Sequence, residues 1–359
     1  MTNGVGPGTD AAALAVTGPM RRVCLLLLAW AAASPAIRSV ALEAPETSQP
    51  SAGSVLALAV LSSPSAVFAG TAAGGLYRSA DGGESWVLVE GPLAGLSVSS
   101  VALDPAEPST ILAGTNGAGL FRSVDGGSKW VESNAGLDNL FVESLAVDPG
   151  PPRAVYAATD GGVFRSEDGG KSWKTLREGL PEPEITALLV VPGGGVFAGT
   201  RRSGAFRLET GAARWRGASA GLGRGTIRGF AAHTAAPATL YAATEGGIFR
   251  SANSSESWSP ANSGLTSTSI LAIAADPAAP GKLYASTVTG LFRTGNGGTE
   301  WTAVETGSAG SFFNTVAIDR AAGIVFAGAD GSVVKSADGG KTWRTVKLPP
   351  PPATAEDEE

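Results

Sequence analysis

Residues 78–86 read RSADGGESW, and the same pattern returns at residues 122–130, 165–173 and 335–343. The tryptophan that ends each copy sets a period, because seven tryptophans stand 42–44 residues apart. They are Trp86, Trp130, Trp173, Trp215, Trp258, Trp301 and Trp343. In the fourth to sixth copies the frame persists, but other residues replace the aspartate. The chain is therefore expected to contain seven copies of one structural unit.

Each period contains four short segments rich in β-forming residues, as the second copy illustrates. Its segments are Val98–Leu103, Thr110–Thr115, Leu120–Ser123 and Trp130–Ser133, separated by turns that carry glycine or an aspartate–proline pair. Such runs predict hairpin-linked strands, and four strands in about 40–45 residues are typical of a propeller blade. We therefore predict an all-β fold, a seven-bladed β-propeller of four-stranded antiparallel blades, over residues 53–348.

Closure of the ring can be predicted from the phase of the repeat. The first copy starts near Ser54 and the last ends near Leu348, so the strands count as seven complete sets. We therefore expect the first and seventh blades to be joined by packed side chains. The alternative is a strand added to the last blade by Ile37–Leu42.

The composition of the 359-residue chain limits the kinds of site that it can hold. A single cysteine, Cys24, and a single histidine, His233, exclude a disulfide framework and a Cys/His zinc site. A net charge of −6 argues against a dedicated nucleic-acid binder. We predict no metal, no cofactor and no nucleic-acid partner. His233 is interpreted as a variant of the aspartate that begins the same turn in other copies.

The two ends of the chain differ from the repeats. Residues 1–36 are interpreted as a leader with a signal peptide that starts at Met20, where Arg21 and Arg22 precede a short apolar run. An uncleaved anchor helix is the alternative, although a span requires about 20 residues. Residues 37–52 are interpreted as a linker and residues 349–359 as a proline-rich, acidic, disordered tail. We expect an exported, periplasmic or extracellular monomer with no membrane span in the mature chain.

A structural role in the turn accounts for the residues of the repeated pattern, without a catalytic role. In residues 81–83 the glycines supply positive φ, while the Asp81 carboxylate accepts hydrogen bonds from the N–H groups of the turn. The tryptophan is expected to pack back against its own hairpin and to hide about 150–250 Å², which is worth roughly 4–6 kcal/mol. We therefore interpret as structural the seven tryptophans and Asp81, Asp125, Asp168 and Asp338. Catalytic acids and calcium ligands are the alternatives for these aspartates.

The pattern S-x-D-G-G-x-x-W resembles the Asp-box, or bacterial neuraminidase repeat, over residues 53–347. The wider repeat is similar to those of sortilin-type ectodomains, photosystem II assembly factors and xyloglucanases. This resemblance implies a propeller but leaves the function open, because one fold hosts many activities. It also implies that ligands meet the face formed by the loops between second and third strands and by the segments joining blades, opposite the boxes.

Departures from the repeat are the places where function is expected in a repeat protein. One departure is basic, because seven arginines stand between Arg201 and Arg228 against one acid, Glu209. Arginine forks suit carboxylates, sulfates and phosphates. The binding candidates are the four arginines in segments of the expected ligand face, namely Arg201, Arg202, Arg224 and Arg228. A solvated surface is the alternative interpretation.

Two further departures are aromatic and acidic. The aromatic candidates precede first strands, where they would act as stacking platforms at the channel mouth or pack between blades: Phe141, Phe312 and Phe313. The acidic candidates are in equivalent second-to-third-strand loops: Asp160, Glu245 and Asp330. Segments that join blades add Glu143, Glu182 and Glu184. Because a glycosidase requires two carboxylates about 5–5.5 or 6.5–9.5 Å apart, the acids remain candidates and no residue is assigned as catalytic.

The sequence leaves three functions open. The leading interpretation is an exported, non-catalytic scaffold that binds a protein segment or a glycan, in the manner of an assembly factor. A glycoside hydrolase and a lectin-like carbohydrate-binding module are the alternatives. Sialidases need a tyrosine nucleophile, whereas all four tyrosines here occupy framework strand positions: Tyr77, Tyr156, Tyr241 and Tyr284. Xyloglucanases use two such propellers, whereas this chain holds one.

Overall fold

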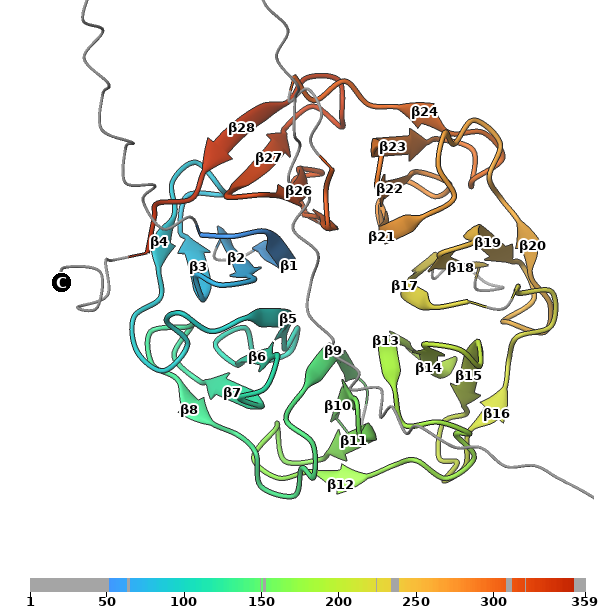
Figure 1. Cartoon of the computed structure of the whole chain (residues 1–359), viewed down its shortest axis with the longest axis horizontal. Coiled ribbons are helices and arrows are strands. Elements are labelled where there is room, and N and C mark those ends of the chain that lie inside the picture. Colours follow the sequence, from blue (N-terminus) through green and yellow to red (C-terminus); the bar gives the residue numbers. More distant parts are fainter. Residues whose placement is uncertain are drawn as a thin grey trace, which may run out of the picture. The chain divides into compact units, whose positions relative to one another are not determined.

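The computed structural model describes residues 52–62, 65–148, 150, 153–223, 225–233, 239–307, 312–319 and 321–351. Within these residues the chain forms 28 β-strands and no helix, and the strands make seven four-stranded antiparallel sheets arranged as a ring (Figure 1). Each sheet is one blade of four consecutive strands. The predicted all-β fold with seven blades is confirmed.

The strands of the first four blades are as follows. Blade 1 contains β1 (Val55–Ser62), β2 (Ser65–Thr71), β3 (Leu76–Ser79) and β4 (Val87–Leu88). Blade 2 contains β5 (Val98–Leu103), β6 (Ile111–Thr115), β7 (Leu120–Ser123) and β8 (Val131–Glu132). Blade 3 contains β9 (Val142–Asp148), β10 (Ala154–Thr159), β11 (Gly162–Ser166) and β12 (Lys174–Thr175). Blade 4 contains β13 (Ile185–Val191), β14 (Gly195–Thr200), β15 (Ala205–Leu208) and β16 (Arg216–Gly217).

The remaining three blades repeat this order. Blade 5 contains β17 (Ile227–His233), β18 (Thr239–Thr244), β19 (Gly247–Ser251) and β20 (Ser259–Pro260). Blade 6 contains β21 (Ile270–Ala275), β22 (Leu283–Thr287), β23 (Gly290–Thr294) and β24 (Thr302–Ala303). Blade 7 contains β25 (Thr315–Ile318), β26 (Val325–Ala329), β27 (Ser332–Ser336) and β28 (Arg344–Lys347).

The four segments predicted for the second copy match β5 to β8, and β6 and β8 are slightly shorter than expected. The fourth strand has only two residues because it pairs with only two residues of the third strand, Phe121 opposite Glu132 and Arg122 opposite Val131. The same pairing of two residues occurs in all blades up to the sixth, whereas β28 pairs with four residues of β27.

The hydrophobic core is shared between neighbouring blades. All residues of β6 and β10 are buried, as expected for strands covered on both faces. One cluster joins Leu112 and Leu120 of blade 2 to Val142, Phe164 and Trp173 of blade 3. Each blade therefore buries its apolar surface by packing against the next one around the ring.

The repeated tryptophans were expected to pack against their own hairpins, and this expectation is incomplete. The indole Nε1 of Trp173 donates to the carbonyl oxygen of Ser133, in the segment that follows blade 2, at 2.7 Å. Equivalent bonds join Trp215 to Leu176, Trp258 to Ala218 and Trp301 to Ala261. Trp130 instead donates to the carbonyl oxygen of Gly127 in its own box at 3.0 Å. Where the preceding blade supplies the partner, the tryptophan joins two blades.

Ring closure rests on contacts between blades 1 and 7. Val55, Val67 and Trp86 of blade 1 share a buried cluster with Phe326 and Val333 of blade 7. The Nζ atom of Lys335 lies 2.6 Å from Glu84, and Tyr77 donates to the carbonyl oxygen of Pro349. Since every sheet contains only consecutive strands, closure among the described residues follows the predicted mode. Ile37–Leu42 lies outside the described residues, as do the predicted leader, most of the linker and residues 352–359 of the tail.

The antiparallel order divides the turns of every blade between two opposite faces of the ring. One face, here the box face, carries the turns between first and second strands and the Asp-box turns between third and fourth strands. The other, here the loop face, carries the loops between second and third strands and the segments joining blades. Arg201, Arg202, Phe141 and Phe312 lie in segments of the loop face, and Arg228 lies at the loop-face end of β17.

Candidate functional site

A ring of β-bulges marks the loop-face end of the innermost strands, which lie closest to the centre in Figure 1. In six of the seven blades the register of the first strand shifts at its second residue. A bulge leaves one residue unpaired and redirects its side chain. The bulged residues are Leu56, Ser99, Glu143, Thr186, Arg228 and Leu271. No such shift is present in β25.

Two of the bulged residues fasten one blade to the next through their hydroxyl groups. Ser99 donates to the carbonyl oxygens of Gly114 and Val142. Thr186 donates to the carbonyl oxygen of Ile227 at 2.5 Å. The bulges at these positions therefore hold the rim of the ring at fixed spacing.

The charged bulge residue Glu143 belongs to a pair of carboxylates on the loop face of blade 3. Burial raises the pKa of Glu143, the Asp160 carboxylate raises it further, and Arg201 opposes the change. The Oδ1 atom of Asp160 is buried and accepts no hydrogen bond from any described residue. A ligand that donates a hydrogen bond would satisfy this atom.

The arginines of the fourth-blade region do not form the uniformly basic patch that the sequence suggested. Arg201 pairs with Glu184 at 2.8 Å, and Arg228 pairs with Glu245 at 2.8 Å. The carboxylate of Glu182 accepts the backbone N–H groups of Arg202 and Ser203. Acids from neighbouring segments therefore balance the basic side chains, and the surface is one of mixed charge. Arg224 lies outside the described residues.

The three aromatic candidates occupy different environments. Phe141 is 47% exposed, and its ring lies above Gly117 of the neighbouring loop. Phe312 is 53% exposed. Phe313 is only 1% exposed and shares a buried cluster with Tyr284 and Leu291 of blade 6, so of its two predicted roles it has the one of packing between blades.

Leu140 stands beside Phe141 and is 38% exposed, although no repeat pattern marked it as a candidate. The carbonyl oxygen of Leu140 accepts the N–H groups of Gly117 and Gly119, and the side chain of Asn139 accepts the N–H of Phe141. These bonds hold the backbone of the pair, whose two apolar side chains are exposed to solvent. The loop-face site comprises this pair, the carboxylates Glu143 and Asp160, and the ion pair of Arg201.

The other acidic candidates are not brought together. Glu245 pairs with Arg228 in blade 5, whereas Asp330 in blade 7 accepts the hydroxyl of Ser54 across the seam. Asp160 is therefore the only one of the three for which the structure places a second acid within electrostatic reach, and that acid is Glu143. In the described part of the chain, no group of three or more His, Cys, Asp and Glu side chains is arranged to hold a metal ion.

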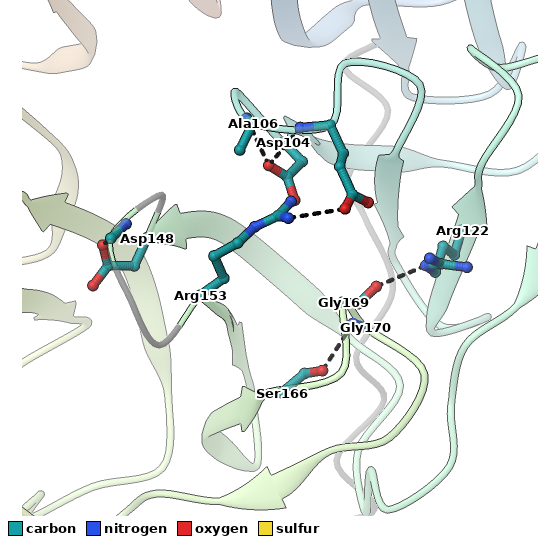
Figure 2. A network of polar contacts seen from close by, with 10 residues as sticks. Asp104, Ala106, Arg122, Asp148, Arg153, Ser166, Gly169 and Gly170 are labelled. Carbon is teal, nitrogen blue, oxygen red and sulfur yellow. Dashed lines mark hydrogen bonds and ion pairs between the residues drawn. The ribbon is translucent and has the colours of Figure 1, made fainter.

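The box face is held by a repeated set of polar contacts. Asp168 accepts the N–H groups of Lys171 and Ser172, while Ser166 accepts the N–H of Gly170 at 2.8 Å. Figure 2 shows the junction of blades 2 and 3, where Nε of Arg122 donates to the carbonyl oxygen of Gly169 at 2.7 Å. Hydrogen bonds from turn groups account for the low pKa of Asp81, about 2, led by the Ser85 side chain.

The turns between first and second strands also cross the junctions. Arg153 of blade 3 pairs with Asp104 and Glu107 of blade 2 (Figure 2). At the corresponding position of blade 5, Nε2 of His233 accepts the N–H of Gly281 from blade 6 at 3.1 Å. His233 is buried there, where burial lowers its pKa. The histidine thus occupies the turn that the sequence assigned to it.

Comparisons with known proteins support the fold. No protein-family model matches the chain, and no curated protein matches it. The GH74 xyloglucanase from Xanthomonas campestris is similar, with a TM-score of 0.66, 18% identity, and coverage of 82% of this chain and 54% of that one. YCF48 from Cyanidioschyzon merolae is similar with a TM-score of 0.58 and 17% identity, and the match covers 80% of this chain and 95% of that one. A YCF48 structure with a bound D1 peptide has a TM-score of 0.59 and 16% identity, and the match covers 85% of this chain and 95% of that one.

These likenesses establish a propeller shared with proteins of different function. The chain spans about half the length of the xyloglucanase that it matches and nearly the whole of each YCF48 chain. None of the described residues forms a helix that is long and apolar enough to cross a membrane.

Proposed function

We propose that the protein is a non-catalytic scaffold that binds a segment of another protein on its loop face. The observation that carries the proposal is the exposed pair Leu140 and Phe141, whose backbone is fixed by hydrogen bonds beside the half-buried Glu143 and Asp160. Rigid apolar anchors next to unsatisfied acceptors are typical of a surface that captures a peptide. We further propose that the protein is exported by its leader and acts outside the cytoplasm.

Several features favour a peptide over a glycan as the ligand. A peptide supplies both apolar side chains for Leu140 and Phe141 and backbone N–H donors for the buried Oδ1 of Asp160. A similar propeller, YCF48, has been solved with a bound D1 peptide. The mixed charge around Arg201 and Arg202 would select among segments by charge complementarity more than it would add affinity.

The experiment compares partner capture by matched variants. The double variant Leu140→Ser/Phe141→Ser removes the proposed anchors. The control Val124→Ser/Val131→Ser removes two apolar side chains that are more exposed than the anchors, from the box turn and outermost strand of blade 2. Immobilised proteins would be exposed to periplasmic or envelope extract, and bound partners identified by crosslinking and mass spectrometry. We expect the partners of the unchanged protein to persist with the control and to be lost with the anchor variant. Equal capture by both would refute the proposal.

A charge reversal tests the predicted arginine surface separately. The changes Arg201→Glu, Arg202→Glu, Arg224→Glu and Arg228→Glu, made together, should alter which partners are captured without abolishing folding, which a thermal melt would check. Partners unaffected by this reversal would show that the arginines take no part in recognition.

A glycoside hydrolase is the second candidate, and the carboxylate pair Glu143 and Asp160 favours it. A raised pKa suits a general acid, and a GH74 xyloglucanase shares the fold. Release of reducing ends from a panel of polysaccharides, compared between the unchanged protein and Asp160→Asn, would test this function. A glycan array would test the lectin-like alternative.

A further inference from the structure

In most junctions of the ring, the second glycine of each Asp-box fills the space beside the preceding blade. A side-chain carbon added to Gly170 would lie 2.5 Å from Leu112, and one added to Gly340 would lie 2.5 Å from Tyr284. The same place is taken by Gly83 against Phe326 and by Gly127 against Phe68. The residue contacted each time comes from the second strand of the preceding blade. The gap between the box and the second strand of the preceding blade therefore accommodates a turn of glycines and excludes larger residues.

Side chains of the preceding blade also donate hydrogen bonds to carbonyl oxygens of the box. Tyr284 donates to Gly339 at 2.7 Å, and Tyr241 donates to Gly297 at 3.2 Å. Arginines of the third strand do the same, from Arg122 to Gly169, from Arg207 to Ser254 and from Arg293 to Gly340. The gap thus offers tyrosine and guanidinium donors to backbone acceptors.

The junction between blades 3 and 4 lacks this filling. The fourth box reads LETGAARW over residues 208–215, with Leu208 for the serine, Thr210 for the aspartate and Ala212 for the second glycine. Ala212 does not adopt the positive φ of the glycines that it replaces. Among the described residues, neither Tyr156 nor Arg165 donates a hydrogen bond to this box, although both occupy the donor positions of the repeat.

Neither of these two donors reaches the fourth box, and their contacts lie within blade 3. Arg165 pairs with Glu167 of its own blade at 2.9 Å, and its guanidinium lies 6.0 Å from the ring centre of Tyr156. The Nε atom of Arg165 is buried and has no hydrogen-bond partner among the described residues. The Nε atom of Arg207 also lacks a partner, but a terminal nitrogen of Arg207 donates to Ser254 in the next box. The donors that bond to the box in other junctions therefore do not bond to it here, and a ligand could accept from them.

A cavity of about 350 Å³ occupies this junction. Its lining includes Tyr156, Arg165, Leu176, Val196, Leu208 and Glu209. A second cavity of about 420 Å³ adjoins it, sharing Arg165 and Leu176. Apolar walls with a few convergent donors are characteristic of a binding pocket.

We propose that this gap, on the face opposite the loop-face site, is a docking site for a glycine-containing turn of a partner polypeptide. The carbonyl oxygens of the turn accept hydrogen bonds from Arg165 and Tyr156, and its small residues pack on Leu176 and Leu208. Arg165 already pairs with Glu167, and Asp148 and Glu209 line the first cavity with it, so the partner turn need not supply a counter-charge. The partner turn takes the place that the box of the next blade takes elsewhere in the ring.

The test uses a peptide whose sequence is a box of this same chain. The probe is SEDGGK, residues 166–171, and its control is SEDAAK, which cannot adopt the positive φ and carries side chains that the gap excludes. Methyl resonances of Leu176 and Leu208 in the isotopically labelled full chain report the binding. We expect SEDGGK to shift both resonances saturably and SEDAAK to leave them unchanged.

Three variants identify the groups responsible. Tyr156→Phe should weaken binding about 5- to 10-fold, the value of one hydrogen bond. Tyr241→Phe, the matched change at a filled junction, should leave binding unchanged. The triple variant Leu208→Ser/Thr210→Asp/Ala212→Gly restores the box and should abolish binding while the protein still folds. Absence of shifts at millimolar SEDGGK, equal shifts with SEDAAK, or equal binding by Tyr156→Phe and the unchanged chain would each overturn the proposal.

Discussion

Within the Asp-box, the tryptophan stabilises the junction of two blades, whereas the aspartate stabilises only its own turn. Trp173 is 4% exposed and contacts two blades, whereas the carboxylate of Asp168 bonds only to its own turn. The burial of a large aromatic side chain between blades outweighs the net value of turn hydrogen bonds. This difference explains why the box of blade 4 keeps Trp215 while it has lost the aspartate.

We predict that Trp173→Ala lowers the free energy of unfolding by about 3–5 kcal/mol, because it leaves a cavity and an unpaired carbonyl oxygen. Asp168→Ala should cost about 1 kcal/mol. Asp168→Asn should cost less than Asp168→Ala, because Asn253 of blade 5 uses its amide oxygen to accept the N–H of Ser257 in the same way. Urea titrations of the three variants would measure this order, and a larger loss for Asp168→Ala than for Trp173→Ala would contradict it.

Some residues could be assigned from the sequence and others could not. The box residues were identified by recurrence alone, since a turn that repeats has the same geometry each time. Phe312 and Phe313 could not be separated, because neighbouring side chains on an extended segment face opposite ways and the sequence does not supply the phase. The pairing of Arg201 with Glu184 was also hidden, because it depends on how one segment folds over the next.

At the scale of the element, the box hairpin is held partly by ionised carboxylates. Hydrogen bonds, led by the side chain and backbone of Ser85, hold the pKa of Asp81 at about 2, and hydrogen bonds within their own boxes lower the pKa of Asp125 and Asp338. A carboxyl group whose pKa is lower in the folded state stabilises that state above its unfolded pKa near 4. Its contribution is lost as the pH falls through the folded pKa.

We therefore predict that the stability of the propeller declines between about pH 4 and pH 2. The variant Asp81→Asn/Asp168→Asn/Asp338→Asn should show a shallower decline, because its box side chains no longer titrate. The urea midpoint measured at steps from pH 7 to pH 2.5 gives the comparison. Identical slopes for the variant and the unchanged protein would show that these carboxylates do not cause the acid sensitivity.

The strands themselves were largely predictable, whereas the β-bulges were not. Short β-rich runs between glycine turns predicted β5 and β7 to the residue. A bulge shifts the register by one residue near the end of a strand, and no residue type at Ser99, Glu143 or Arg228 signals it. Glu143 was expected in a segment joining blades, and only the strand pairing shows that it is the bulged second residue of β9.

At the scale of the whole molecule, the junctions of the ring are unequal. Tryptophan cross-links join blades 2 and 3, 3 and 4, 4 and 5, and 5 and 6. The indole Nε1 atoms of Trp86 and Trp343 have no hydrogen-bond partner among the described residues, so both junctions of blade 7 lack this bond. The contact of Lys335 and Arg344 with Glu84 is the main polar link across the seam.

We predict that Glu84→Gln destabilises the protein by about 1–2 kcal/mol, because the buried ammonium of Lys335 loses its counter-charge. The matched control is Glu256→Gln, at the same position of the blade 5 box, where the carboxylate is exposed and forms no ion pair with a described residue. Thermal melts at low ionic strength should show a lower midpoint only for Glu84→Gln. Equal melting midpoints for the two variants would show that the ion pair does not stabilise the seam.

Every blade is a contiguous piece of chain, and residues 52–54 meet residues 330, 331 and 348 at the seam. The blades follow one another around the ring in the order of the chain (Figure 1), and the first and last blades meet at the seam. A gene whose reading frame began at blade 4 or blade 6, with the original ends bridged by a short peptide, would encode the same ring by circular permutation.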